Sequence, residues 1–177
     1  MTGRTWAAGK LFDCAPHYVD VIGQWAGAPV VRVAAFGNKL AAAGPCSAEL
    51  PQSAVILLEY ANGVRGTFNF SAVTRVNDDA SFGVVGTTGR IAGNPWLPEG
   101  AGSYELRTEG GLFKGGFVVD GGKTSRGHLG FSEQFINFVD AVLRGGPNVC
   151  TFDEAFAVHR LMVAIDKSLS TGHVMEV

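Results

Sequence analysis

The sequence predicts an α+β fold, a mainly antiparallel open β-sheet with helices packed on one face. Three observations predict it: one helical pattern near the start, a long central region of short β-rich runs separated by glycine turns, and two helical patterns at the end. Strands that follow one another before a run of helices favour α+β over an alternating α/β fold. At 177 residues the chain is long enough for one ordinary domain, which we expect to span residues 1–177.

The first predicted helix spans about Phe12 to Ala26, where apolar residues recur at helical spacing and Gly27 follows as a stop signal. Pro16 then falls in the first turn, where proline is tolerated. A strand is predicted over Val30 to Phe36, because β-branched and small residues alternate there. The Ala, Gly and Pro-rich residues of Gly37 to Pro51 predict a surface connection.

Three strand pairs are predicted in the central region. Asn62-Gly63, which tolerates positive φ, joins Ala54 to Tyr60 with Val64 to Val73 and is a strong hairpin signal. Val55 to Leu58 is apolar on both faces, which predicts a strand covered on both sides. The second pair is Ser81 to Val85 with Arg90 to Ala92 around a glycine turn, and the third is Tyr104 to Arg107 with Phe117 to Asp120.

Two helices and a short strand are predicted to close the chain. Phe131 to Leu143 carries one apolar stripe. Phe152 to Leu169 is preceded by Thr151, which begins a capping box, and is closed by Gly172. His173 to Val177 can add a last strand to the sheet.

Composition narrows the classes of function. The net charge is −2 and no basic stripe is present, so nucleic acid is not expected as a partner. No apolar run is long enough for a membrane span, and three widely spaced cysteines without a secretory leader favour reduced thiols in the cytoplasm. Charged residues make up only 17%, so we expect either that a partner covers part of the surface or that the protein is poorly soluble.

The most informative segment lies at the start of the first helix. Asp13 and His17 are spaced i, i+4 and therefore share a helical face, where a carboxylate can hold one imidazole nitrogen and support proton transfer. The alternative interpretation is structural: Asp13 favours the helix dipole and His17 caps nearby backbone. The spacing alone leaves both interpretations open. A metal site would need Asp20 and further ligands to converge, and none is predicted.

The wider pattern adds to this. Gly9, Asp13, His17 and Asp20 are in register with a pattern of the kind G-G-x-x-x-D-x-G-x-H-x-x-D, and the sequence resembles the substrate domain of the Gfo/Idh/MocA group of NAD(P)-dependent sugar and polyol dehydrogenases. The resemblance covers nearly the whole chain. It continues through the following features: the Asn62-Gly63 hairpin, the Gly86 to Gly89 turn with Ile91, the Phe135 to Phe138 helix, and the closing segment Ala164 to Gly172.

The resemblance implies a role for each candidate residue. Asp13 and His17 correspond to residues that line the substrate pocket, with the histidine as proton relay or hydroxyl ligand. Lys10 stands where a third glycine is common, and Ala15 where glycine is usual, but neither change removes a reacting group. Lys10 could contact substrate or remain solvated. His128, in the glycine-rich loop before the penultimate helix, is a further candidate for substrate contact.

The resemblance also implies what the chain lacks. In the family, NAD or NADP binds a Rossmann domain that ends in an E-K-P lysine, and the open sheet packs against another subunit, which implies a homo-oligomer through this sheet face. The chain contains no E-K-P and no G-x-G-x-x-G opening a helix, and we expect one sheet strand to be missing at its start. We therefore expect a substrate-binding and oligomer-forming half of an oxidoreductase, inactive and without cofactor by itself. The alternative is a stand-alone binding or assembly module that uses the same sheet and catalyses nothing.

Overall fold

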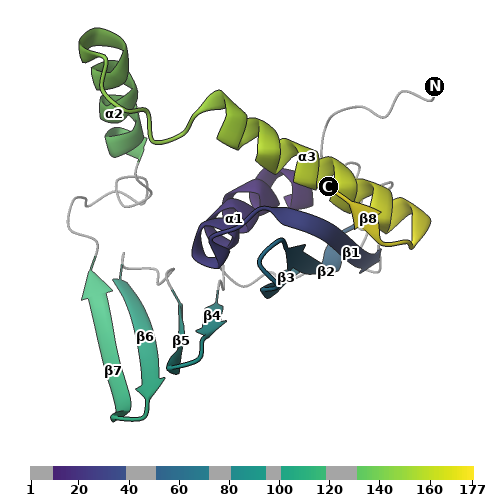
Figure 1. Cartoon of the computed structure of the whole chain (residues 1–177), viewed down its shortest axis with the longest axis horizontal. Coiled ribbons are helices and arrows are strands. Elements are labelled where there is room, and N and C mark those ends of the chain that lie inside the picture. Colours follow the sequence, from purple (N-terminus) through teal and green to yellow (C-terminus); the bar gives the residue numbers. More distant parts are fainter. Residues whose placement is uncertain (1–9, 39–50, 72–80, 95–100, 119–130) are drawn as a thin grey trace. The chain divides into compact units, whose positions relative to one another are not determined.

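The structure, a computed structural model, describes residues 10–38, 51–71, 81–94, 101–118 and 131–177. The chain divides into two compact units: Met1–Thr74 with Cys150–Val177 form the first, and Arg75–Val149 form the second. Figure 1 shows the helices and strands of both units.

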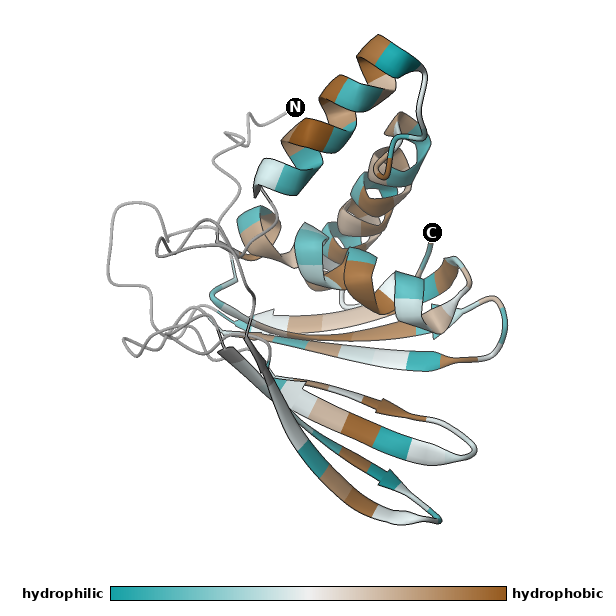
Figure 2. Cartoon of the chain, turned by 90° about the vertical axis from the view of Figure 1, so that its left-hand side faces the viewer, coloured by the Kyte–Doolittle hydropathy of each residue, from teal (hydrophilic) through white to brown (hydrophobic). Residues whose placement is uncertain are grey.

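The first unit is an antiparallel sheet with two helices on one face. Its strands are β1 (Val30–Asn38), β2 (Ser53–Tyr60), β3 (Arg65–Ser71) and β8 (Met175–Glu176), in the order β3-β2-β1-β8. The helices are α1 (Lys10–Ala26) and α3 (Phe152–Thr171), which contact each other and the sheet. Both lie on the same side of these strands (Figure 2).

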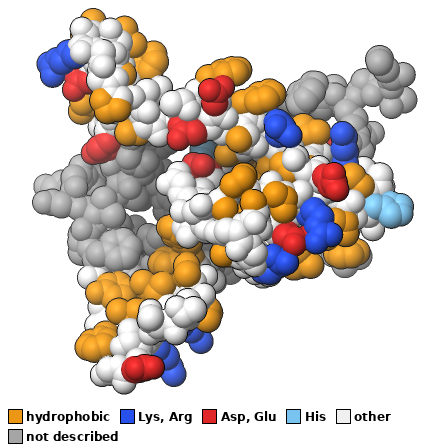
Figure 3. Space-filling view, viewed as in Figure 1, with side chains coloured by type: hydrophobic (Ala, Val, Ile, Leu, Met, Phe, Trp, Pro, Cys, Tyr) orange, Lys and Arg blue, Asp and Glu red, His pale blue; other side chains and the backbone are white. Residues whose placement is uncertain are grey.

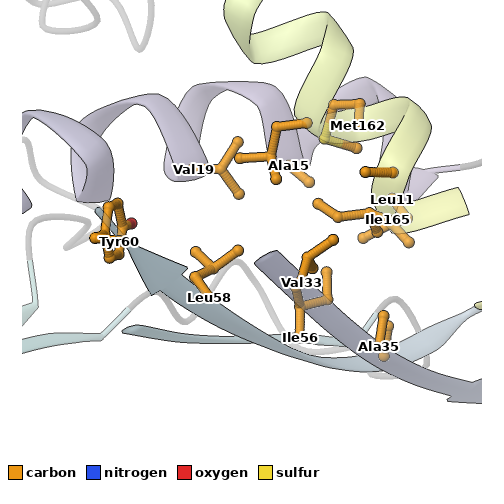
Figure 4. Packing of buried hydrophobic residues seen from close by; sticks show 13 residues of the cluster. Leu11, Ala15, Val19, Val33, Ala35, Ile56, Leu58, Tyr60, Met162 and Ile165 are labelled. Atoms are coloured by element: carbon orange, nitrogen blue, oxygen red, sulfur yellow. The ribbon is translucent and has the colours of Figure 1, made fainter. Parts of the chain in front are cut away.

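The core of this unit fills the space between the helices and the sheet (Figure 4). Alternate residues of β2 point into it, as the period of two in a strand requires. Helix α1 contributes one buried residue per turn, and α3 adds a second apolar face. The buried apolar residues are Leu11, Ala15, Val19, Val33, Ala35, Ala54, Ile56, Leu58, Tyr60, Leu161, Met162, Ala164 and Ile165.

The opposite face of this sheet is open. Phe36, Val55 and Leu57 have exposed fractions of 63%, 47% and 46%, and the register places Phe36 beside Val55 and Leu57 beside Ala34. The described part of the chain therefore covers the central strand on one side only, whereas its two-sided apolar pattern predicted cover on both.

An ion network borders these apolar residues on the open face. Glu59 binds Arg32 with one carboxylate oxygen and Arg65 with the other, the second pair at 2.8 Å. Arg32, Glu59 and Arg65 are direct neighbours on three adjacent strands. The network thus lies across the strands at one end of the open face.

Ser168 completes the hydrogen bonding of β1 where β8 is too short to do so. β8 pairs only with Arg32 and Val33, so the amide of Ala35 has no strand partner at that edge. The Ser168 hydroxyl accepts a bond from Ala35 N at 2.8 Å and donates one to the carbonyl of His173 at 2.6 Å. Ser168 is 1% exposed, so its hydroxyl joins α3, β1 and the turn before β8 inside the core.

The ends of α3 and the first hairpin follow the sequence prediction. Thr151 and Glu154 form a capping box, and Gly172 ends the helix in the left-handed conformation with φ of 72°. Gly63 has φ of 88° between β2 and β3. Asn62 accepts a bond from the amide of Val64 and donates one to the last carbonyl of α1, at Ala26.

The second unit contains a four-stranded antiparallel meander. Its strands are β4 (Phe82–Val85), β5 (Gly89–Asn94), β6 (Ala101–Thr108) and β7 (Gly111–Val118), in the order β4-β5-β6-β7. The register separates two faces. One face carries Phe82, Val84, Ile91, Tyr104, Leu106 and Phe113. The other, here called the polar face, carries Arg90, Asn94, Ser103, Glu105, Arg107 and Lys114 together with the apolar Val85, Ala92 and Leu112.

Two aromatic rings of this sheet lie over glycines on neighbouring strands. A Cβ atom on Gly115 would stand 2.6 Å from the ring of Tyr104, and one on Gly93 would stand 3.0 Å from the ring of Phe82. A cross-strand aromatic ring covers the backbone that a glycine leaves bare. On the polar face, Arg90 is directly opposite Arg107, an arrangement of like charges that destabilises a strand pair.

Helix α2 (Phe131–Arg144) belongs to the same unit and carries a local clamp. The Asn137 side chain donates to the carbonyl of Pro147 at 3.1 Å and accepts from the amide of Val149 at 3.0 Å. These two bonds fix the segment that follows α2, which leads into α3.

The predicted fold class is confirmed, with the described strands in two sheets. Two boundaries differ from prediction. Helix α1 begins at Lys10, so Pro16 lies beyond the first turn and supplies no amide to the carbonyl of Phe12. The third strand pair turns at Glu109 and Gly110 and sets Tyr104 opposite Gly115, so the predicted pairing with Phe117 to Asp120 is wrong. Residues 119 and 120 lie outside the described part.

Candidate functional site

Helix α1 presents two different faces, and its outer face carries the candidate pair. Leu11, Ala15 and Val19 recur every four residues and are buried against the sheet. Because a helix repeats every 3.6 residues, Asp13 and His17 fall on the side away from this buried stripe. Both side chains are exposed to solvent.

The described contacts of this pair are few. The Asp13 carboxylate contacts the Cys14 thiol, at 4.0 Å. Among the described residues, no hydrogen bond or ion pair joins Asp13 to His17. The i, i+4 spacing therefore brings an acid and an imidazole to one exposed surface without linking them.

The outer face of α1 continues the polar character of this pair. Asp20, one turn after His17, accepts a bond from the amide of Gln24 at 3.1 Å. Asp13 lies in the first turn, where the positive end of the helix dipole favours a carboxylate. The two carboxylates therefore flank the imidazole of His17 along the helix.

The remaining predicted candidates are placed less completely. Lys10 is the first residue of α1, and its side chain lies outside the described part. His128 also lies outside the described residues. His159 is exposed, and its Nδ1 is 2.7 Å from the carbonyl oxygen of Ala155. In the described part no three His, Cys, Asp or Glu side chains gather where they could hold a metal ion.

A shallow concavity of about 440 Å³ lies on the sheet of the second unit. Lys114 and Glu105 form an ion pair at 2.8 Å in its lining, and the hydrogen bond from Lys114 lowers the pKa of Glu105 below its ordinary value, with further help from its charge. Sequence reasoning missed this pair because it placed the partner strand of Glu105 too late in the chain. The residues that line the concavity are Ser81, Ala92, Gly93, Asn94, Ser103, Tyr104, Glu105, Lys114 and Gly115.

A comparison with protein families identifies the first part of the chain. The model of the GFO/IDH/MocA C-terminal domain matches residues 2–92, which include α1, β1 to β4 and most of β5. The chain belongs to this family. The match covers just over half of the chain, including the helix that carries Asp13 and His17.

Solved structures share the fold over almost the whole chain. Aldose-aldose oxidoreductase from Caulobacter crescentus, complexed with glycerol, is 15% identical with a TM-score of 0.77, over 96% of this chain and 48% of its own. An oxidoreductase domain protein from Kribbella flavida is 16% identical with a TM-score of 0.75, over 96% of this chain and 51% of its own. An oxidoreductase from Agrobacterium radiobacter, in complex with NAD+, L-tartaric acid and magnesium, is 18% identical with a TM-score of 0.74, over 96% of this chain and 49% of its own.

These matches cover only part of each solved structure. The chain spans about half the length of the solved structures that it matches. At these identities the similarity establishes the fold of the C-terminal domain of Gfo/Idh/MocA oxidoreductases. A comparison with curated proteins gave no match. No described helix is both long enough and apolar enough to cross a membrane.

Proposed function

We propose that this domain is the substrate-binding half of an NAD(P)-dependent oxidoreductase that acts on a secondary alcohol of a sugar or polyol. The observation that carries the proposal is the exposure of Asp13 and His17 on one face of α1. The structural alternative, in which Asp13 favours the helix dipole and His17 caps nearby backbone, is separated from it by the experiment below. The glycerol and L-tartaric acid bound by two similar structures support a hydroxylated substrate.

The chemistry assigned to this chain is the handling of one proton. Oxidation of an alcohol to a carbonyl removes a hydride from carbon and a proton from oxygen. His17 can accept the hydroxyl proton at one ring nitrogen, since a neutral imidazole has one acceptor nitrogen. Asp13, one turn earlier, can accept a hydrogen bond from the other nitrogen once the ring turns toward it, which would fix the tautomer.

The described residues do not fit the cofactor itself. A dinucleotide requires a glycine turn that opens a helix, with the pyrophosphate at the helix N-terminus. The turn at Gly86 to Gly89 leads into β5, and α3 carries Asp153 and Glu154 in its first turn, where they repel phosphate. We therefore assign NAD or NADP, the hydride acceptor, to a nucleotide-binding half outside the described residues, and expect no activity from this domain by itself.

The proposal is tested by fusing the chain to a nucleotide-binding half of the same family and measuring turnover with polyols. His17→Ala should lower kcat on the order of a hundredfold or more, the usual scale for removal of a general base. Gln24→Ala, a change on the same exposed face two turns away, is the matched control and should leave kcat unchanged. Thermal unfolding should be the same for both variants. A fusion that turns over equally well without the His17 imidazole contradicts the assigned role.

A second function, assembly, is supported by the open face of the first sheet. Phe36, Val55 and Leu57 form an exposed apolar strip beside the Arg32, Glu59 and Arg65 network, which is the composition of an interface core with a charged rim. We propose that two copies associate through this face. Light scattering should show a dimer or larger species, and Leu57→Asp should shift it to monomer. A monomer at every accessible concentration of the unaltered chain refutes the proposal.

A further inference from the structure

The polar face of the second sheet carries more positive than negative charge. Its cations are Arg90, Arg107 and Lys114, and its carboxylate is that of Glu105. Lys114 binds this carboxylate at 2.8 Å, whereas the Arg107 guanidinium is 3.9 Å from it. The Arg90 guanidinium makes no ion pair with any described residue. In Figure 3, basic side chains lie together at the lower margin of the second unit.

The two arginines face each other across β5 and β6. Cβ atoms of directly opposite residues are about 4.5–5.5 Å apart, so Arg90 and Arg107 repel each other. The positive field is also felt by Glu105, whose pKa is lowered first by the hydrogen bond and charge of Lys114 and then by the charges of Arg107 and Arg90. An anion between the two guanidinium groups would turn this repulsion into attraction, because each can donate two parallel N–H bonds to a carboxylate or phosphate.

The concavity lies on the same sheet, next to the arginine pair. Ala92, which lines it, follows Arg90 by two residues and is about 7 Å further along β5. Gly83 is opposite Ala92 on one side and Glu105 on the other, so small side chains leave room in this row. Ser103 lines the far end of the concavity. A volume of about 440 Å³ is within the range of small-molecule sites, and every residue named belongs to the second unit.

We propose that the polar face binds an anionic sugar, either a sugar acid or a sugar phosphate, with its charged group between Arg90 and Arg107 and its hydroxylated body over Ala92. The Ser103 hydroxyl can donate to and accept from sugar hydroxyls. Glu105 repels an anion from the neighbourhood of Lys114, which directs the charged group to the arginine pair. The site lies in a different unit from the candidate pair of α1 and does not rest on the proposed function.

The test titrates the full chain with gluconate and glucose 6-phosphate, and NMR follows the arginine Nε groups and the amides of residues 90–94 and 103–107. We expect saturable shifts with one or both, and the tighter of the two identifies the anionic group. Glucose, which lacks the charge, and acetate and inorganic phosphate, which lack the sugar body, are the controls. The proposal is overturned if neither anionic sugar binds at millimolar concentration, or if a control binds as tightly as its counterpart.

Variants separate the charge from the hollow. Arg107→Gln should weaken binding about tenfold or more, the scale for loss of a hydrogen bond to a charged group. Its unfolding midpoint should not fall, because the change also removes the repulsion with Arg90. Ala92→Leu fills the hollow without a change of charge and should weaken binding of the sugar as well. Arg144→Gln, at an exposed arginine paired with Asp140 on α2, is the matched control and should bind normally. Arg90→Gln should behave as Arg107→Gln does, and unaltered affinity in either variant contradicts the proposal.

Discussion

Replacement of Ser168 by alanine should destabilise the first unit through a single lost hydroxyl. The amide of Ala35 is buried beyond the end of β8 and depends on Ser168 Oγ at 2.8 Å, with no strand partner to replace it. The other bond, to the carbonyl of His173, can be replaced by water because His173 is exposed. Only the Ala35 amide is therefore left unsatisfied.

A buried backbone N–H without a partner costs about 1–3 kcal/mol, and we expect a loss of about 2 kcal/mol in the free energy of unfolding. For a chain of this size that corresponds to a decrease of about 4–8 °C in Tm. Urea denaturation followed by circular dichroism measures the first quantity, and hydrogen exchange at the Ala35 amide reports the affected bond directly. Exchange there should become faster.

Ser170→Ala is the matched control, because Ser170 lies two residues later on α3 and donates its bond to the carbonyl of Lys167 at an exposed position. This change should alter stability by no more than about 0.5 kcal/mol, as is usual for surface substitutions. If Ser168→Ala were equally mild, or if the Ala35 amide exchanged at an unchanged rate, the hydroxyl would not be satisfying β1 and the reasoning would be wrong.

Three further predictions concern single side chains. Tyr60→Phe should be neutral or stabilise by up to about 1 kcal/mol in urea denaturation, because the buried Tyr60 hydroxyl has no hydrogen-bond partner among the described residues. Burial also raises the pKa of Tyr60, so wild-type stability should fall as pH rises above 10, where the unfolded tyrosine ionises first, and the variant should lack this loss. Thr151→Ala should lower helix content and cost about 1 kcal/mol, and NMR titration should show the pKa of Glu154, which is depressed by hydrogen bonds from the Thr151 amide and hydroxyl, return toward its usual range. Gly115→Val should displace the Tyr104 ring and cost about 1–3 kcal/mol, measured as a lower midpoint of unfolding of the second sheet, and an unchanged midpoint would show that the ring can move without loss.

The elements that sequence predicts well here are those whose signals are local. Asn62-Gly63 identifies the first hairpin because a tight hairpin turn requires residues that tolerate positive φ. Thr151 and Gly172 mark the ends of α3 because they cap its backbone. The i, i+4 spacing of Asp13 and His17 likewise predicts a shared face, which follows from helix geometry alone. The exposure of both side chains depends on what packs around α1, and the spacing gives no information on that packing.

The errors arise where distant residues determine local structure. Gly110, Gly111, Gly115 and Gly116 give β7 the composition of a loop, and the strand is supported by β6 and by the Tyr104 ring across from Gly115. The β-propensities of the residues in one strand contain no information on such support from a neighbouring strand. The same error concealed the pairing of Glu105 with Lys114. The burial of Ser168 was also not predictable, since it depends on β8 ending two residues short of Ala35.

The facing arginines of the second sheet have a consequence for solubility. Its polar face carries three cations, Arg90, Arg107 and Lys114, against the single carboxylate of Glu105. Two copies meeting through this face would bring four guanidinium groups together at a distance within the range of about 8 Å over which charges interact at physiological ionic strength. Stacking of this sheet on itself is therefore repelled, whereas the two arginines beside the apolar strip of the other sheet, Arg32 and Arg65, are both paired with Glu59. Concentrated salt would weaken that repulsion, and precipitation of the protein in salt would be expected to begin at this face.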